Sequence, residues 1–319
     1  MALADLSGSA DSVFFPKKDD SPAFVRSEIV FLDDQGLGVV VTDSVSDFHA
    51  GKYRGQPIEL VAHDEISRLS LIRVSLTPGE KSTPVELGSS LELLEGASLF
   101  TAHEGELSAS RLVSRESSYR DKPLPLELIR LHSPSEEKPI SGDAFYDSAG
   151  RLVAICYRPA LEHGNGCLAF PVEVVKRLTQ STVVDGIVQR SWFGVELLSS
   201  DPFAVVEGVR QDSPAAKAGL LKGDIILDIG PRKIRNYSDA IDAFYYLREN
   251  EASQVRLLRG VEELTLEVMP ELVPLPKDVP TEVVPPPKAE EPEVQPTPPS
   301  ALPEEGSIQT AEKEAAPSE

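Results

Sequence analysis

Between about residues 20 and 188 the chain alternates short β-branched, apolar runs with turn-forming residues, and this rhythm constrains the fold more than any other feature. Helical spacing over a dozen residues hardly occurs between the runs, so the pattern favours an all-β barrel or sandwich over βαβ units. VEVVKRLTQS, at 172–181, is the exception and is predicted to be a helix that ends this region. The runs are EIVFL, GVVVT, IELVAH, LSLIRV, SLFTA, RLVAICY and CLAFPV.

A different pattern occupies about residues 191–272, where five predicted strands are interleaved with two helices. The first helix has Ser213 as its N-cap, Pro214 at its first position and Gly219 at its C-terminus. The second helix is expected within YSDAIDAFYYLREN, at 237–250. Strands around two helices of these lengths indicate a small α+β module.

The segment 273–319 is rich in proline and glutamate and nearly lacks aromatic residues. Such a composition cannot bury enough apolar surface to offset chain entropy, so we predict a disordered tail with polyproline II character. The segment is either a spacer or a docking site for a proline-recognising domain.

The composition limits the class of partner. With 40% hydrophobic and 26% charged residues, the 319-residue chain is typical of a soluble globular protein of two or three domains, without a membrane-spanning stretch. A formal net charge of −21 argues against nucleic acid and anionic membranes, and favours peptides and proteins. No metal-ligand spacing such as HExxH occurs, and no cofactor is expected. The opening MALADLSGSADS lacks the features of a secretory signal, so either the protein is intracellular or a signal was removed.

The only two cysteines are Cys156 and Cys167, in neighbouring β-like runs. Two thiols cannot form a disulfide framework or close a zinc site. A hairpin would bring the two runs together, so two alternatives stay open, buried free thiols and a cross-strand disulfide.

The stretch DSPAAKAGLLKGDIILDIGPRKIRNYSDAIDAF, at 212–244, resembles a PDZ domain of the bacterial protease-associated class. Upstream, SWFGVELL resembles the carboxylate-binding loop and first groove strand of such domains. The resemblance implies that a strand edge beside the second helix binds an extended peptide or a protein C-terminus. The implied loop positions are Trp192, Phe193, Gly194 and Val195. Ile241, Phe244 and Tyr245 are candidates for the side-chain pocket, or else simply pack the domain core.

The preceding region resembles the trypsin-like lobes of the HtrA protease family in four blocks and the following CLAFPVEVVKRL. The blocks are GVVVTDSVSDF, HDEISRLSLIRV, PVELGSSLELLEGASLFTAHEGELSASRLVS and ISGDAFYDSAGRLVAICY. The resemblance implies a mainly β fold, with an N-terminal segment (1–20), a trypsin-like double six-stranded β-barrel (21–188), a PDZ domain (191–272) and a disordered tail (273–319).

Carried over residue by residue, the resemblance implies that the catalytic triad is lost. The histidine position falls on Val45, or on Ser44 if the alignment slips by one, and the aspartate position falls on Arg68. Neither Val45 nor Ser44 can act as a base, and a guanidinium at position 68 would repel an imidazolium. Ser141 occupies the nucleophile position, but Pro139 stands where an oxyanion-hole amide is needed, and proline has no amide hydrogen.

The remaining histidines offer no obvious substitute. His49 would serve as base only if the GVVVT strand slipped out of register, and His132 belongs to the other lobe. The histidines His63, His103 and His163 complete the set. We therefore expect an inactive HtrA-like protein that binds peptides as a scaffold, sensor or regulator in protein quality control.

Two alternatives stay open: an active serine endopeptidase with a rearranged site around Ser141, and a structural envelope protein with a vestigial groove. The resemblance also implies active HtrA proteases as partners and a periplasmic or other extracytoplasmic location. It further implies a homotrimer in which Phe14 and Phe15 either form the contact or cover the barrel.

Overall fold

A computed structural model describes residues 11–16, 24–42, 50–103, 106–116, 126–133, 138–160, 165–199 and 202–273. Residues 1–275 form one compact unit, and residues 276–319 form a second unit that lies outside the described residues. The disorder predicted for the tail therefore stays a prediction. Within the described ranges, no helix is both long enough and apolar enough to cross a membrane.

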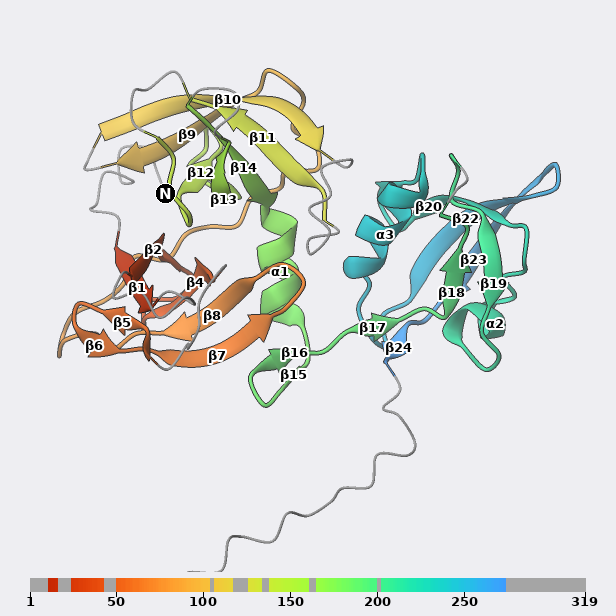
Figure 1. Cartoon of the computed structure of the whole chain (residues 1–319), viewed down its shortest axis with the longest axis horizontal. Coiled ribbons are helices and arrows are strands. Elements are labelled where there is room, and N and C mark those ends of the chain that lie inside the picture. Colours follow the sequence, from red (N-terminus) through yellow and green to blue (C-terminus); the bar gives the residue numbers. More distant parts are fainter. Residues whose placement is uncertain are drawn as a thin grey trace, which may run out of the picture. The chain divides into compact units, whose positions relative to one another are not determined.

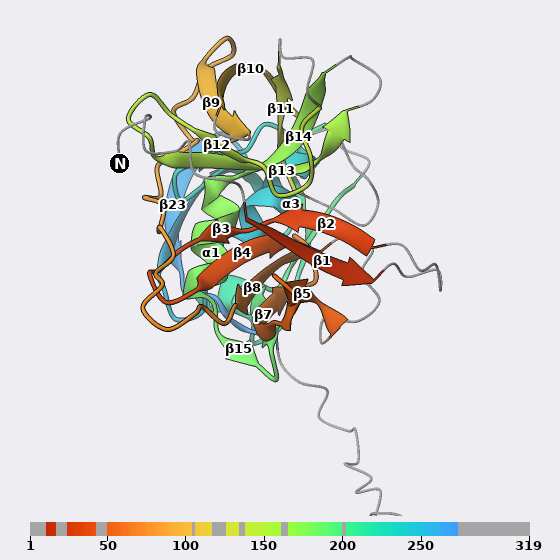
Figure 2. The same cartoon turned by 90° about the vertical axis from the view of Figure 1, so that its left-hand side faces the viewer.

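The first lobe is built from two sheets (Figures 1 and 2). The larger sheet has the strand order β15-β16-β7-β8-β4-β3, and the smaller one has the order β2-β1-β5-β6. Apolar side chains such as Val13, Phe15, Tyr53 and Ile72 fill the space between them. The strands are β1 (Ser12–Pro16), β2 (Phe24–Glu28), β3 (Val30–Phe31), β4 (Leu37–Val41), β5 (Lys52–Tyr53), β6 (Gln56–Pro57), β7 (Glu59–Asp64), β8 (Leu69–Arg73), β15 (Val183–Val184) and β16 (Ile187–Val188).

The second lobe is a closed six-stranded barrel with the order β10-β11-β14-β13-β12-β9. Its interior holds Leu99, Ile129, Phe145 and Ala154 among other buried apolar residues. The mainly β, two-lobed, trypsin-like fold is thereby confirmed. Of the two six-stranded barrels that were predicted, the second is closed, whereas the first lobe consists of the four-stranded and six-stranded sheets described above. The strands are β9 (Ser98–His103), β10 (Glu106–Glu116), β11 (Leu128–His132), β12 (Ala144–Tyr146), β13 (Leu152–Ala160) and β14 (Gly166–Pro171).

Helix α1 (Val172–Gln180) follows the barrel, as the spacing of its apolar residues predicts. Val172, Val174, Val175 and Leu178 are buried in a core cluster that includes residues of both lobes. The helix contacts β8 of the first lobe and β13 and β14 of the second. It therefore fixes the two lobes against each other.

The C-terminal domain begins at β17 (Ser191–Trp192), and its main sheet has the order β21-β20-β22-β23. Helix α2 (Pro214–Ala218) has the predicted caps, because the Ser213 side chain accepts a hydrogen bond from the Ala216 amide and Gly219 is left-handed. Helix α3 (Tyr237–Tyr245) is capped by Asn236 and ends earlier than predicted. The other strands are β18 (Val195–Leu197), β19 (Val206–Val209), β20 (Ile225–Ile229), β21 (Arg232–Lys233), β22 (Ser253–Arg259), β23 (Glu262–Val268) and β24 (Glu271–Leu272).

The two phenylalanines expected near a subunit contact differ in their surroundings. Phe15 is fully buried in the first lobe, whereas Phe14 is 44% exposed. Phe15 therefore covers the barrel core, and Phe14 alone is available for a contact with another subunit.

Candidate functional site

Val45 and Ser44, the predicted histidine positions, and His49, the nearest alternative, lie outside the described residues. Strand β4, which leads to them, ends at Val41, and Thr42 is the last described residue before them. Both the amide and the hydroxyl of Thr42 donate to the carbonyl of Arg68, at 2.9 and 2.8 Å. Thr42, the last described residue before the predicted histidine positions, is therefore hydrogen-bonded to Arg68, the predicted aspartate position.

Arg68 ends the turn between β7 and β8 with a φ of 58°, in the left-handed region that non-glycine residues rarely adopt. Its guanidinium Nη1 donates to the hydroxyl of Tyr157 at 3.3 Å. A cation bonded to a phenol thus stands at the position that was predicted to correspond to the family's orienting carboxylate.

Ser141 lies in the turn before β12, and its hydroxyl donates to the main-chain carbonyl of Tyr157 at 2.9 Å. The carbonyl of Ser141 accepts from the Glu28 amide at 3.0 Å. Arg68 and Ser141 are therefore brought together on one residue, Tyr157, which the sequence analysis missed. Only the long apolar run LVAICY pointed to it, and such a run does not single out one side chain.

The backbone around Ser141 is hydrogen-bonded within the loop. The Ile140 amide donates to Oδ2 of Asp143 at 2.8 Å, the Gly142 amide to the Cys156 carbonyl at 2.8 Å, and the Asp143 amide to the Ile140 carbonyl at 3.2 Å. Pro139 has no amide hydrogen. Of the two positions that the resemblance implies for an oxyanion hole, 139 and 141, position 139 therefore offers no amide donor.

A buried acid, Glu28, lies directly against this loop. Its side chain accepts from the Ser12 hydroxyl at 3.0 Å and pairs with Arg26 at 2.5 Å. Burial raises the pKa of Glu28, despite these two partners. The left-handed Gly142 packs on the same residue so closely that an added Cβ would lie 2.4 Å from the Glu28 carbonyl oxygen.

Two histidines have described side chains, and neither bonds Ser141. His63 Nδ1 is 2.9 Å from the Ser70 hydroxyl, and burial lowers the pKa of His63. His132 is exposed at the end of β11. His163 and the side chain of His103 lie outside the described residues.

The predicted carboxylate loop precedes β18. Gly194 has a φ of +84°, and a Cβ there would lie 2.1 Å from Cβ of Ser213, so glycine is required. The Phe193 carbonyl accepts from the Ala215 amide at 3.0 Å, which ties the loop to α2. Trp192 and Val195, on either side, are partly exposed.

Strand β18 pairs with β19 on one side, and no other strand pairs with it within the described ranges. On α3, Phe244 packs against Phe193 with ring centroids 5.1 Å apart, and Ile241 is partly exposed. This geometry is consistent with the predicted groove between β18 and α3.

Tyr245, the third predicted pocket residue, lies elsewhere. Its hydroxyl donates to Oδ2 of Asp64 at 2.6 Å, and its ring belongs to the core cluster shared by the two lobes. The Arg177 guanidinium lies 4.5 Å from the ring centroid. The prediction for Tyr245 is wrong because one helical face of α3 packs against the lobes instead of facing the groove.

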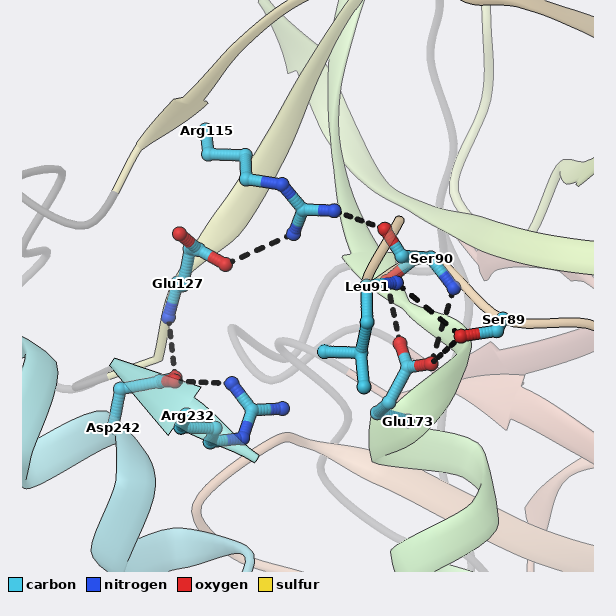
Figure 3. Close-up of polar contacts among 8 residues, drawn as sticks. All are labelled: Ser89, Ser90, Leu91, Arg115, Glu127, Glu173, Arg232 and Asp242. Atoms are coloured by element: carbon cyan, nitrogen blue, oxygen red, sulfur yellow. Dashed lines mark hydrogen bonds and ion pairs between the residues drawn. The ribbon is translucent and has the colours of Figure 1, made fainter. Parts of the chain in front are cut away.

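Polar contacts continue this packing (Figure 3). Asp242 on α3 accepts from the Glu127 amide at 2.8 Å and from Arg232 Nη1 at 2.9 Å. Arg115 Nη1 in turn donates to Glu127 Oε2 at 3.1 Å. The face of α3 that points away from the core of the C-terminal domain therefore packs against the barrel.

Cys156 and Cys167 are free thiols, and both are buried in the second lobe. Cys156 lies opposite Ala169, and Cys167 lies opposite Pro159, so the two are offset along the β13–β14 pair. Burial raises the pKa of Cys156. Within the described part of the chain, no group of three or more His, Cys, Asp or Glu side chains could hold a metal ion.

Comparisons with known proteins agree with this architecture. The family model described as PDZ domain matches residues 191–269. Serine endoprotease DegS of Haemophilus influenzae is 30% identical over 143 residues, 42% of each chain. A probable periplasmic serine endoprotease DegP-like of Rhizobium meliloti is 26% identical over 153 residues, which cover 43% of this chain and 30% of the relative. The chain thus spans less than half the length of these curated relatives.

Solved structures show the same fold. The HtrA-type protease AlgW with tripeptide matches 86% of this chain and 97% of its own, with a TM-score of 0.55 and 19% identity. AlgWS227A with decapeptide matches 88% of this chain and 100% of its own, with a TM-score of 0.54 and 20% identity. In sequence and in fold, the chain is therefore similar to the HtrA-type serine proteases, and its residues 191–269 form a PDZ domain.

Proposed function

We propose that this chain is a catalytically inactive relative of the HtrA-type proteases that binds extended peptides or protein C-termini. The observation that carries the proposal is the hydroxyl of Ser141, which donates to the Tyr157 carbonyl at 2.9 Å. A serine hydroxyl without an adjacent base is a weak nucleophile. Arg68, bonded to the same tyrosine, supplies a cation instead of an orienting carboxylate.

The binding half of the proposal rests on the PDZ domain. The side of β18 on which no described strand pairs, the glycine-containing loop before it and the partly exposed Ile241 on α3 would together form the peptide groove. An extended peptide would add a strand to β18, and amides of the loop would hold its terminal carboxylate. In this function the chain acts as a scaffold, sensor or regulator in protein quality control.

Peptide binding is tested by fluorescence anisotropy with a library of labelled peptides that have free C-termini. We expect saturable binding that is lost when the best peptide is amidated at its C-terminus. Ile241→Lys should weaken binding about tenfold, whereas Val261→Lys, at a fully exposed hairpin position, should not change it. No binder above background would refute the binding half, and casein cleavage that disappears in Ser141→Ala would refute the inactive half.

Location and assembly are part of the same proposal. Relatives whose names describe them as periplasmic support an extracytoplasmic location for this chain. Cell fractionation tests this location. The exposed Phe14 supports a homotrimer, and active HtrA proteases would be natural partners. Light scattering should give three times the chain mass of 34.6 kDa, and Phe14→Ser should lower it.

A further inference from the structure

A cavity of about 500 Å³ opens between α1 and the PDZ domain. On one side it is lined by Glu173, Lys176 and Gln180 of α1. On the other side it is lined by the β20–β21 turn at 229–232 and by the residues that lead into β22. Figure 3 includes three lining residues, Leu91, Glu173 on α1 and Arg232 on β21. The peptide groove beside β18 is a separate place, because no residue of β18 lines this cavity.

The charge of the lining is the reverse of that of the chain. The whole chain has 52 acidic and 31 basic residues. The cavity is lined by two acidic residues, Glu173 and Glu251, and by four basic ones. The basic residues are Lys176, Arg177, Arg232 and Arg248. A local excess of cations on an acidic protein favours an anionic ligand.

Most of these charges already have partners. Arg232 pairs with Asp242 at 2.9 Å, and Arg248 donates to Gln180 at 2.7 Å and pairs with Glu251. Glu173 accepts from the Ser90 hydroxyl and amide, at 2.5 and 3.1 Å. Arg177 has no ion pair with a described residue, but it donates to the main-chain carbonyls of Tyr245 and Gln189. Among the four basic lining residues, Lys176 is the one whose charged group has neither an ion pair nor a hydrogen bond with any residue that the structure describes. The uncommitted charge of the lining is therefore positive.

The cavity also offers an unused hydrogen-bond donor and an apolar wall. Tyr246 lines it, and the hydroxyl of Tyr246 is buried without a partner among the described residues. A buried hydroxyl without a partner costs free energy, which a ligand acceptor would recover. The apolar part of the lining comprises Leu91, Ile229, Pro231, Ala243, Leu247 and Ala252. A small inorganic anion could not use this wall.

We infer that the cavity between α1 and the PDZ domain binds an acidic peptide segment, with carboxylates next to small apolar residues. Lys176 pairs with a carboxylate of the segment, and the Tyr246 hydroxyl donates to one of its oxygens. The apolar residues of the segment pack against Leu91, Pro231 and Ala252, the exposed apolar residues of the lining. The ligand needs no free C-terminus, which separates this site from the carboxylate loop at Gly194.

The test uses a fluorescein-labelled peptide EEPEVEEPEV that is acetylated and amidated at its ends, so that the carboxylate loop cannot hold it. Anisotropy is measured with the full chain and with residues 1–275, which form one compact unit and lack the acidic tail as a competitor. We expect saturable binding to residues 1–275 that weakens as salt is raised from about 20 to 300 mM.

Two variants and a matched control locate the site. Lys176→Glu should weaken binding about tenfold, and Tyr246→Phe, which removes only the hydroxyl, should weaken it about fivefold. Lys222→Glu makes the same charge change at an exposed lysine outside the lining and should leave binding within about twofold. The inference is overturned if neither form of the chain binds the peptide, or if Lys176→Glu and Lys222→Glu have equal effects. Ile241→Lys should not change the affinity for this capped peptide. Binding at the cavity and binding at the groove beside β18 can therefore fail independently of each other.

Discussion

The hydroxyl of Tyr245 donates a 2.6 Å hydrogen bond to Oδ2 of Asp64, which joins helix α3 of the PDZ domain to the turn after β7. Asp64 also organises that turn, because it accepts from the Ser67 hydroxyl at 2.7 Å and the Ile66 amide at 3.1 Å. The turn ends at Arg68, which bonds Tyr157. The turn that carries Arg68, the predicted position of the catalytic acid, is therefore fixed partly from the PDZ domain.

Removing the Tyr245 hydroxyl should destabilise the protein. In Tyr245→Phe the buried Asp64 loses one partner, and we expect a loss of about 1–3 kcal/mol in the free energy of unfolding, measured with urea. Tyr246→Phe is the matched control, because the Tyr246 hydroxyl is buried without a described partner. Equal losses in the two variants would contradict the importance of the Tyr245–Asp64 contact.

The stability of the protein should depend on pH through Asp242. Burial raises the pKa of Asp242 from 3.8 to about 6, although Arg232 and the Glu127 amide favour the ionised form. A raised pKa means that the folded state binds the proton more tightly. The resulting stabilisation is complete below about pH 3.8 and is lost as the pH rises through about 6.

Over this pH range the free energy of unfolding should fall by at most about 3 kcal/mol as Asp242 loses its proton. Asp242→Asn should remove this part of the pH dependence. Urea unfolding at pH 4.5 and pH 7 measures the free energy of unfolding of the original chain, of Asp242→Asn and of Asp212→Asn, which changes an exposed residue and serves as the control. If Asp242→Asn and Asp212→Asn show the same difference between the two pH values, Asp242 does not titrate in this range.

The packing of the Ser141 loop on β2 can be tested with two glycines. Gly142 and Gly96 have φ values of +92° and +86°, so alanine is strained at both. An added Cβ at Gly142 would lie 2.4 Å from the Glu28 carbonyl oxygen, whereas nothing lies within 4 Å at Gly96. We expect Gly96→Ala to cost about 1 kcal/mol and Gly142→Ala at least about 2 kcal/mol more. Similar thermal midpoints for the two variants would argue against tight packing of this loop.

Thiol titration distinguishes the two states of the cysteines. Because Cys156 and Cys167 are buried and burial raises the pKa of Cys156, a thiol reagent should react slowly with the folded chain. In denaturant it should modify two thiols rapidly. A chain purified without reductant that shows no thiols in denaturant would contain the disulfide instead.

Much of the fold follows from sequence patterns of short range. Alternating strands, the Ser213 cap and the left-handed Gly219 are local features, and the structure has each of them. Strand β10 (Glu106–Glu116) was not among the predicted runs, because it is rich in serine and charged residues. Pairing with β9 and β11 on both sides, which a single sequence window does not reveal, makes it a strand.

The site was harder to predict than the fold. Phe244 and Tyr245 are adjacent aromatic residues on α3, and helical spacing alone does not tell which face meets another part of the chain. The phenol of Tyr245 could have signalled a polar partner, since buried tyrosine hydroxyls usually find one. Tyr157 was missed because its main-chain carbonyl, and not its side chain, accepts the Ser141 hydroxyl.

The inactive function that we propose requires that no base activates the Ser141 hydroxyl. A biotinylated diphenyl phosphonate, which reacts with activated serines, tests this directly when labelling is measured by intact mass. We expect no more labelling of the chain than of Ser141→Ala, even with the best PDZ-binding peptide present. Stoichiometric labelling at Ser141 that is abolished in Ser141→Ala would contradict the account.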